Sequence, residues 1–247
     1  MTANQRIVEL RERIRVLEGI QPLGRRMLPF GLAALDRHLP GGGLPLGALH
    51  EAFGGRRDPY AAAPTLFVAG IFARQSGPVL WCFERHDLFA PGLAAAGLHP
   101  DRVIYAEAGR GSGVLLLMEE GLKHAGLCGV VGEVGNLSLT ASRRLQLAAE
   151  SSGVTVFALR RWLRDDATVE EPNAAMTRWG ITALPSAPLP TAGIGRARWQ
   201  LELLRCRNGE AASWSVEACD AQGRLAVPSD LADGSAAPEW ERRHATG

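Results

Sequence analysis

The sequence contains hardly any lysine. Its 27 basic residues are arginines with a single exception, Lys123. Proteins that bind nucleotide phosphates through a glycine-rich loop end that loop in Gly-Lys-Ser/Thr, because a compact ammonium group reaches the β- and γ-phosphates. That sequence does not occur in the chain, and Lys123 lies in a segment predicted to be helical. The lack of lysine therefore excludes a standard phosphate loop.

Long apolar runs and cysteine pairs are also missing. No apolar stretch is long enough to cross a bilayer, and the first residues lack the apolar centre of a signal peptide. The four cysteines form no Cys-x-x-Cys pair and lie in strand-like runs, which indicates buried free thiols. We therefore expect a cytoplasmic protein that does not contact membranes. The cysteines are Cys82, Cys128, Cys206 and Cys219.

Motifs for metal binding and serine hydrolysis are absent as well. His50-Glu51 and the group Glu84, His86 and Asp87 lack the spacing and the third ligand of a zinc site, and we assign His50 to a strand end. There is no Gly-x-Ser-x-Gly sequence. The net charge of +1 argues against a strongly basic nucleic-acid-binding protein. We expect no metal ion, and direct contact with DNA stays open.

What the sequence does contain is a regular alternation of strand-like and helical segments. With 247 residues and 46% hydrophobic side chains, the chain suits one large α/β domain. The early strands are continuous apolar runs, which is typical of a parallel sheet covered on both faces. From Thr177 onward, strand-like runs around an Asn-Gly turn predict an antiparallel extension. We divide the chain into an N-terminal amphipathic helix with a linker (1–28), a core (29–228) and a tail predicted to be disordered (229–247).

The segment from Phe30 to Thr65 organises the rest of the chain. It runs from a glycine cluster, Gly41 to Gly43, into a predicted strand and then into an alanine-rich helix. This order resembles the RecA-like, P-loop NTPase-type core, in which the phosphate loop lies between the first core strand and its helix. The lysine is missing here, and a planar guanidinium is a poor substitute for it. The degenerate Walker A loop comprises Gly54, Gly55, Arg56, Arg57 and Thr65.

Two glutamates stand near the positions at which RecA-like ATPases activate water and bind magnesium. Glu84 follows the second predicted strand, one residue out of step with the RecA pattern, and such a shift turns a side chain to the other face. Glu133 ends a later strand in place of the Walker B aspartate. Without the loop lysine, phosphoryl transfer loses most of its positioning and charge stabilisation. We predict no enzyme activity and no cofactor, while weak residual ATPase activity and ATP binding without hydrolysis stay open.

Three further groups are candidates for contact with other molecules. An apolar stripe follows the predicted helix over residues 5–18, and it either packs on its own domain or joins another chain, including a second copy. Arg205 and Arg207 stand at a predicted hairpin turn, either solvated or directed at a partner's acidic groups. Arg143 and Arg144 begin a helix, either facing solvent or touching DNA phosphate. The stripe consists of Ile7, Leu10, Ile14 and Leu17.

Eight segments carry a resemblance to a known family: Phe30–Gly31, Leu35–Asp36, Leu39–Pro45, His50–Glu51, Val131–Val134, Leu139–Glu150, Thr177–Trp179 and Leu204–Arg207. Together they resemble the ImuA family, RecA-like bacterial proteins of the inducible mutagenesis cassette that are also labelled SulA-like. The resemblance implies a non-catalytic adaptor or regulator of SOS-induced, error-prone translesion DNA synthesis after DNA damage. The implied partners are the inactive Y-family polymerase-like protein ImuB, an error-prone replicative-type DNA polymerase and RecA. The alternatives are a divergent, nucleotide-dependent recombinase relative that binds DNA, and a SulA-type inhibitor of cell division.

Overall fold

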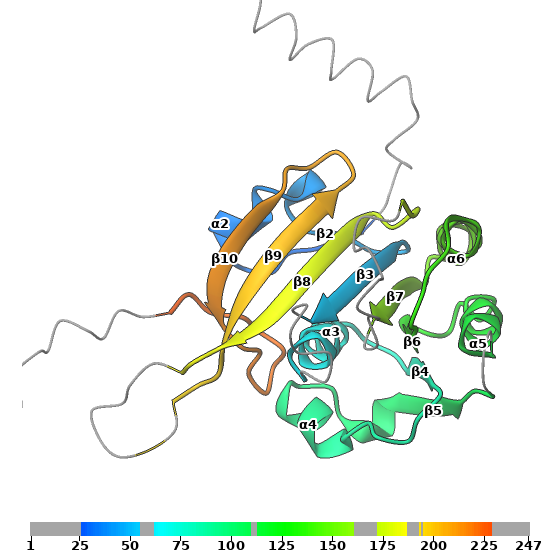
Figure 1. Cartoon of the computed structure of the whole chain (residues 1–247), viewed down its shortest axis with the longest axis horizontal. Helices are drawn as coiled ribbons and strands as arrows, with labels where there is room; N and C mark the ends of the chain where they lie inside the picture. The colour runs from blue at the N-terminus through cyan, green and yellow to red at the C-terminus, as the bar shows by residue number, and fades with distance from the viewer. Residues whose placement is uncertain are drawn as a thin grey trace, which may run out of the picture.

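The computed structural model of the chain describes residues 26–54, 62–109, 113–160, 172–186, 193 and 195–228. Their main sheet consists of eight strands: β3 (Leu49–Gly54), β4 (Val79–Phe83), β5 (Val103–Glu107), β6 (Gly129–Glu133), β7 (Thr155–Arg160), β8 (Thr177–Leu184), β9 (Arg198–Cys206) and β10 (Ala212–Glu217). The spatial order is β10-β9-β8-β3-β7-β6-β4-β5 (Figure 1). All neighbouring strands in the part of this order that runs β8-β3-β7-β6-β4-β5 pair in parallel, whereas β9 and β10 pair antiparallel. The predicted parallel sheet with an antiparallel extension is confirmed.

Helices follow the parallel strands and cover both faces of the sheet. On one face, α3 (Ala63–Ala73) and α4 (Ala90–Ala95) pack over large buried side chains that include Trp81 and Phe157. On the other face, α5 (Gly113–Gly121) and α6 (Leu139–Ser152) pack over smaller residues such as Val130 and Val156. The two pairs lie on opposite sides of the sheet in Figure 1. Within the described ranges, no helix has both the length and the apolar character needed to cross a membrane.

The helix ends follow from local sequence chemistry. Ser138 caps α6, because its side-chain oxygen accepts a hydrogen bond from a backbone N–H of the first turn at 3.2 Å. Gly153 ends the helix with a φ of 76°, a left-handed conformation that favours glycine. Helix α4 begins at Ala90, since Pro91 lacks an N–H and suits the first turn of a helix.

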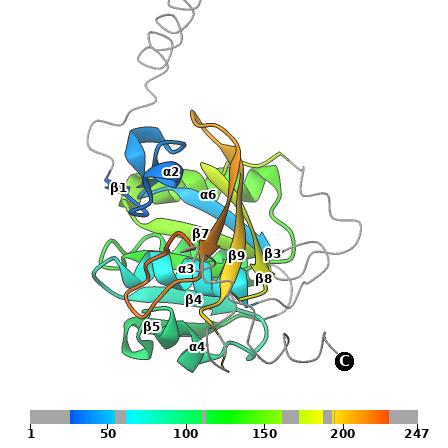
Figure 2. The same cartoon turned by 90° about the vertical axis from the view of Figure 1, so that its left-hand side faces the viewer.

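A smaller N-terminal unit packs against the antiparallel end of the sheet. It consists of β1 (Met27–Leu28), α2 (Ala33–Asp36), η1 (Pro40–Gly42) and β2 (Leu44–Pro45), and β1 pairs with β2. Trp214 of β10 donates from its indole nitrogen to the carbonyl oxygen of Ala34 at 3.2 Å, and its ring lies edge-on to His38. Figure 2 shows α2 beside the β9–β10 hairpin. These contacts fix the hairpin that carries Arg205 and Arg207.

Candidate functional site

The degenerate phosphate loop connects β3 to α3. Gly54 is the last residue of β3 and is buried, and Thr65 is buried in the first turn of α3. Gly55, Arg56 and Arg57 lie outside the described residues. The strand and the helix that hold a phosphate loop in a RecA-like core are therefore both present and anchored in the core.

Glu133, at the Walker B position, is tied to a tryptophan. It is the last residue of β6 and is 4% exposed. Its Oε1 accepts a hydrogen bond from Nε1 of Trp81 at 3.0 Å, and Trp81 is fully buried in the neighbouring β4. A buried indole N–H requires an acceptor, and a carboxylate supplies a strong one. The arrangement gives Glu133 a structural role in the core, whether or not it also faces a ligand.

Glu84, the other predicted ATPase carboxylate, has a different environment. It is exposed in a bend directly after β4. The preceding Phe83 is buried and stacks against the ring of His86, with centroids 5.2 Å apart. In the sequence both glutamates stand at the ends of apolar strands. In the structure Glu133 is buried and hydrogen-bonded to Trp81, whereas Glu84 is exposed.

The most highly charged part of the core surrounds Glu51, whose side chain is fully buried in β3. Its Oε2 accepts from Nε of Arg178 on β8 at 2.6 Å and from Nδ2 of Asn173 at 2.7 Å. Its Oε1 accepts from Nη1 of Arg160, the last residue of β7, at 3.2 Å. Arg160 also donates to the carbonyl oxygen of Gly135 at 3.3 Å. This cluster, Glu51, Arg160, Arg178 and Asn173, joins three strands to the segment that precedes β8.

His50 points to the opposite face of β3. Its ring nitrogens lie 2.7 Å from Oγ1 of Thr177 and 2.8 Å from the carbonyl oxygen of Pro45, and the side chain is fully buried. The assignment of His50 to a strand end is wrong, because it is the second residue of β3 and is enclosed by β2 and β8. His50 and Glu51 therefore serve separate networks on the two faces of the sheet.

A β-bulge directs Arg205. The register between β8 and β9 shifts between Arg178 and Trp179, which leaves Leu204 as an extra residue on β9. Arg205 follows this bulge, and its Nη1 donates to the carbonyl oxygen of Asn173 at 2.8 Å. The guanidinium of Arg205 therefore supports the outer side of the Glu51 cluster while its side chain stays exposed.

Arg205 and Arg207 lie far along the sheet from the phosphate loop. They flank Cys206, which pairs with Thr177 at the start of β8, and β8 runs parallel to β3. Gly54 is at the other end of β3. Both arginines are exposed. They are therefore not directed at the phosphate loop of their own molecule, and they remain available to a second molecule.

The other candidate contact residues have different environments. Arg144 forms an ion pair with Glu119 of α5, whereas Arg143 is exposed on α6. The apolar stripe of the predicted N-terminal helix lies outside the described residues. Sequence reasoning missed the partners of Glu51 and Glu133, because they come from strands distant in the chain. The one signal in the sequence was a glutamate within an apolar strand, which requires compensation when buried.

Comparisons with known proteins agree with this geometry. No protein-family model matches the chain. Two relatives named Protein ImuA, from Caulobacter vibrioides strains NA1000/CB15N and ATCC 19089/CIP 103742/CB 15, are each 39% identical over 206 residues, which covers 79% of this chain and 84% of the relative. Among solved structures, the RadB recombinase is similar with a TM-score of 0.58 and 17% identity, over 82% of this chain and 100% of RadB. At that identity the likeness supports the RecA-like fold alone.

Proposed function

Because the chain belongs to the ImuA family, we propose that it is a non-catalytic, RecA-like adaptor or regulator of SOS-induced, error-prone translesion DNA synthesis. Its partners in this role are an ImuB-type polymerase-like protein, an error-prone replicative-type DNA polymerase and RecA, and its compartment is the cytoplasm. The family membership supports a role in induced mutagenesis, and the chemistry of the core supports the non-catalytic part of the proposal.

The observation that carries this proposal is which residues stand at the ATPase positions and what they contact. The loop that would need a lysine has none, and the carboxylate at the Walker B position accepts a hydrogen bond from the indole of Trp81. Phosphoryl transfer depends on positioning and charge stabilisation by such groups. The RecA-type fold is then retained for its surface, which partners recognise, and the chain needs neither ATP nor another cofactor.

The exposed arginines of the β9–β10 hairpin support a partner-binding role. Arg205 and Arg207 are held by backbone contacts with the segment before β8, and both are exposed. Positioned arginines recognise carboxylates through paired N–H donors. In our proposal they bind acidic groups of a partner in the mutagenesis complex.

An isosteric variant tests the non-catalytic role. Glu133→Gln removes the charge that a metal ion would need but keeps an oxygen for the Trp81 indole. We expect a strain lacking this protein to regain damage-induced rifampicin-resistant mutants when it receives either the wild type or Glu133→Gln. Purified wild-type protein should release no phosphate from ATP, with or without single-stranded DNA. ATP turnover that disappears in Glu133→Gln, together with loss of induced mutagenesis, would refute the proposal.

The alternative is a divergent, nucleotide-dependent recombinase relative that binds DNA, and the RecA-like fold that the chain shares with RadB is compatible with it. Binding measurements with fluorescent ATP analogues and labelled single-stranded DNA distinguish this alternative from the adaptor role. Saturable binding of both, with DNA binding that depends on nucleotide, would favour this alternative.

A further inference from the structure

Strand β5 forms an open edge of the sheet. It ends the strand order, and all five of its residues pair in register with β4. The N–H of Ala108 donates to the carbonyl oxygen of Phe83 at 2.7 Å. Because backbone groups alternate in direction along a strand, those of Tyr105 and Glu107 point away from β4. In the described part of the chain no strand pairs with them, and the β5 sequence has no proline or lysine of the kind that usually protects an edge.

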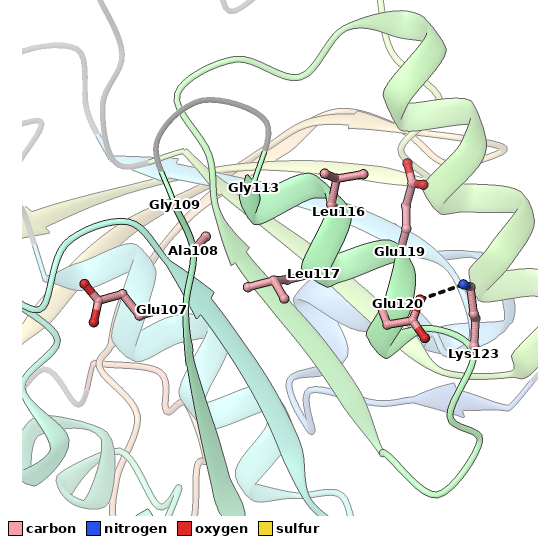
Figure 3. Close-up of a pocket in the computed structure, with 9 residues that line it drawn as sticks. All are labelled: Glu107, Ala108, Gly109, Gly113, Leu116, Leu117, Glu119, Glu120 and Lys123. Carbon is pink, nitrogen blue, oxygen red and sulfur yellow. Dashed lines mark hydrogen bonds and ion pairs between the residues drawn. The ribbon is translucent and has the colours of Figure 1, made fainter.

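A pocket of about 520 Å³ opens beside this edge, between the end of β5 and α5 (Figure 3). Its apolar wall includes Ala108, Leu116 and Leu117. In Figure 3, Leu117 projects from α5 toward β5. Leu116 is 60% exposed, and Ile104, on the α5 side of β5, is 50% exposed. The α5 side of the edge therefore offers apolar surface to an added strand.

The other side of β5 offers a different chemistry. Tyr105 and Glu107 are two residues apart and share a face, and the Glu107 side chain points away from α5 in Figure 3. Tyr105 is 38% exposed. Among the described residues Glu107 has no ion-pair partner. A guanidinium on an added strand would pair with the carboxylate and stack on the phenol ring.

We propose that the β5 edge is a docking site for an extended segment of a partner protein in which apolar side chains alternate with arginine. The segment adds a ninth strand through the backbone groups of Tyr105 and Glu107. Its apolar side chains enter the α5 pocket, and its arginines face Glu107 and Tyr105. This inference rests on the adaptor proposal, since it gives the adaptor a specific surface for a partner, but its test measures binding alone.

The experiment selects ligands from a phage-displayed library of random twelve-residue peptides on the purified full-length protein. We expect the enriched peptides to alternate apolar residues with arginine. A fluorescein-labelled consensus peptide should lose about tenfold in affinity on Glu107→Arg or Leu116→Asp, equivalent to about 1.4 kcal/mol. Glu210→Arg, a matched charge reversal at the opposite end of the sheet, should leave the affinity unchanged. Methylation of alternate peptide nitrogens should abolish binding only for the set that faces β5.

Several results would overturn the docking site. They are the absence of enriched peptides, enrichment of acidic or purely apolar peptides, and wild-type affinity in both Glu107→Arg and Leu116→Asp. Binding that N-methylation of the peptide does not change would also overturn it. Ile104→Lys provides a second apolar-face variant if Leu116→Asp unfolds in a thermal melt. Sedimentation of the wild type distinguishes a further case: self-association that Leu116→Asp abolishes would assign the edge to a second copy of this chain. A failure in peptide binding leaves the adaptor role standing, because that role is judged by induced mutagenesis.

Discussion

Removing the carboxylate of Glu51 should destabilise the protein more than any other single loss of charge described above. Glu51→Met keeps much of the side-chain volume but leaves the guanidinium groups of Arg160 and Arg178 without their shared buried partner. Removing one member of a buried ion pair costs about 3–5 kcal/mol, because the remaining charge stays desolvated. For a domain of this size, 1 kcal/mol shifts the melting temperature by about 2–4 °C, so we expect a decrease of roughly 6–20 °C.

Urea denaturation followed by circular dichroism measures the effect. Glu202→Met is the matched control, since Glu202 is half-buried on β9 and has no ion pair among the described residues. It should change the free energy of unfolding by about 0.5 kcal/mol or less. Glu51→Met combined with Arg160→Met and Arg178→Met should recover part of the loss, because no uncompensated charge then remains. A loss below about 1 kcal/mol in Glu51→Met, or a triple variant less stable than the single one, would refute the reasoning.

Three other predictions follow from the described contacts. Trp81→Phe removes the donor to Glu133 and should lower the free energy of unfolding by about 1–3 kcal/mol, whereas Glu133→Gln keeps the acceptor and should cost less; urea titration compares them. Arg205→Glu with Arg207→Glu should keep the far-ultraviolet circular dichroism spectrum but weaken pull-down of the polymerase-like partner and lower induced mutagenesis; unchanged values of both would exclude these arginines from the interface. Burial raises the pKa of the Cys82 thiol from its ordinary 9.0 to about 12, so the thiol stays protonated to a higher pH in the folded protein than in the unfolded chain. Stability should therefore be independent of this thiol below about pH 9 and fall from there to about pH 12, and a Cys82→Ala variant should show a smaller decline in alkaline urea titrations.

The sequence predicted the parts of the fold that depend on local patterns. Continuous apolar runs located β4 and β6, and the Asn-Gly turn located the β9–β10 hairpin, because strand burial and turn conformation leave short-range signals. The bulge at Leu204 was not predictable in the same way. It arises from pairing between β8 and β9, and the sequence of either strand alone does not record a register shift.

The candidate site shows the same division. The lack of a loop lysine and the glutamate at the Walker B position are visible in the sequence. The role of that glutamate is not visible, because its donor, Trp81, lies 52 residues earlier. Arg178 lies 127 residues from Glu51, so recognising their ion pair requires the strand order. Side-chain partners across a parallel sheet are set by topology, and composition does not reveal them.

The Glu51 cluster also has a consequence for the order in which the chain folds. Arg160, Asn173 and Arg178 follow Glu51 by 109, 122 and 127 residues, so each contact closes a long loop. Loop closure must precede the gain from such contacts, which makes them slow to form. A chain emerging from the ribosome carries Glu51 in its first core strand long before the arginines are synthesised. Until β7 supplies Arg160 and β8 supplies Arg178, burial of β3 leaves the Glu51 carboxylate without its full set of partners in the core, and the cluster thereby opposes early closure of an incomplete sheet.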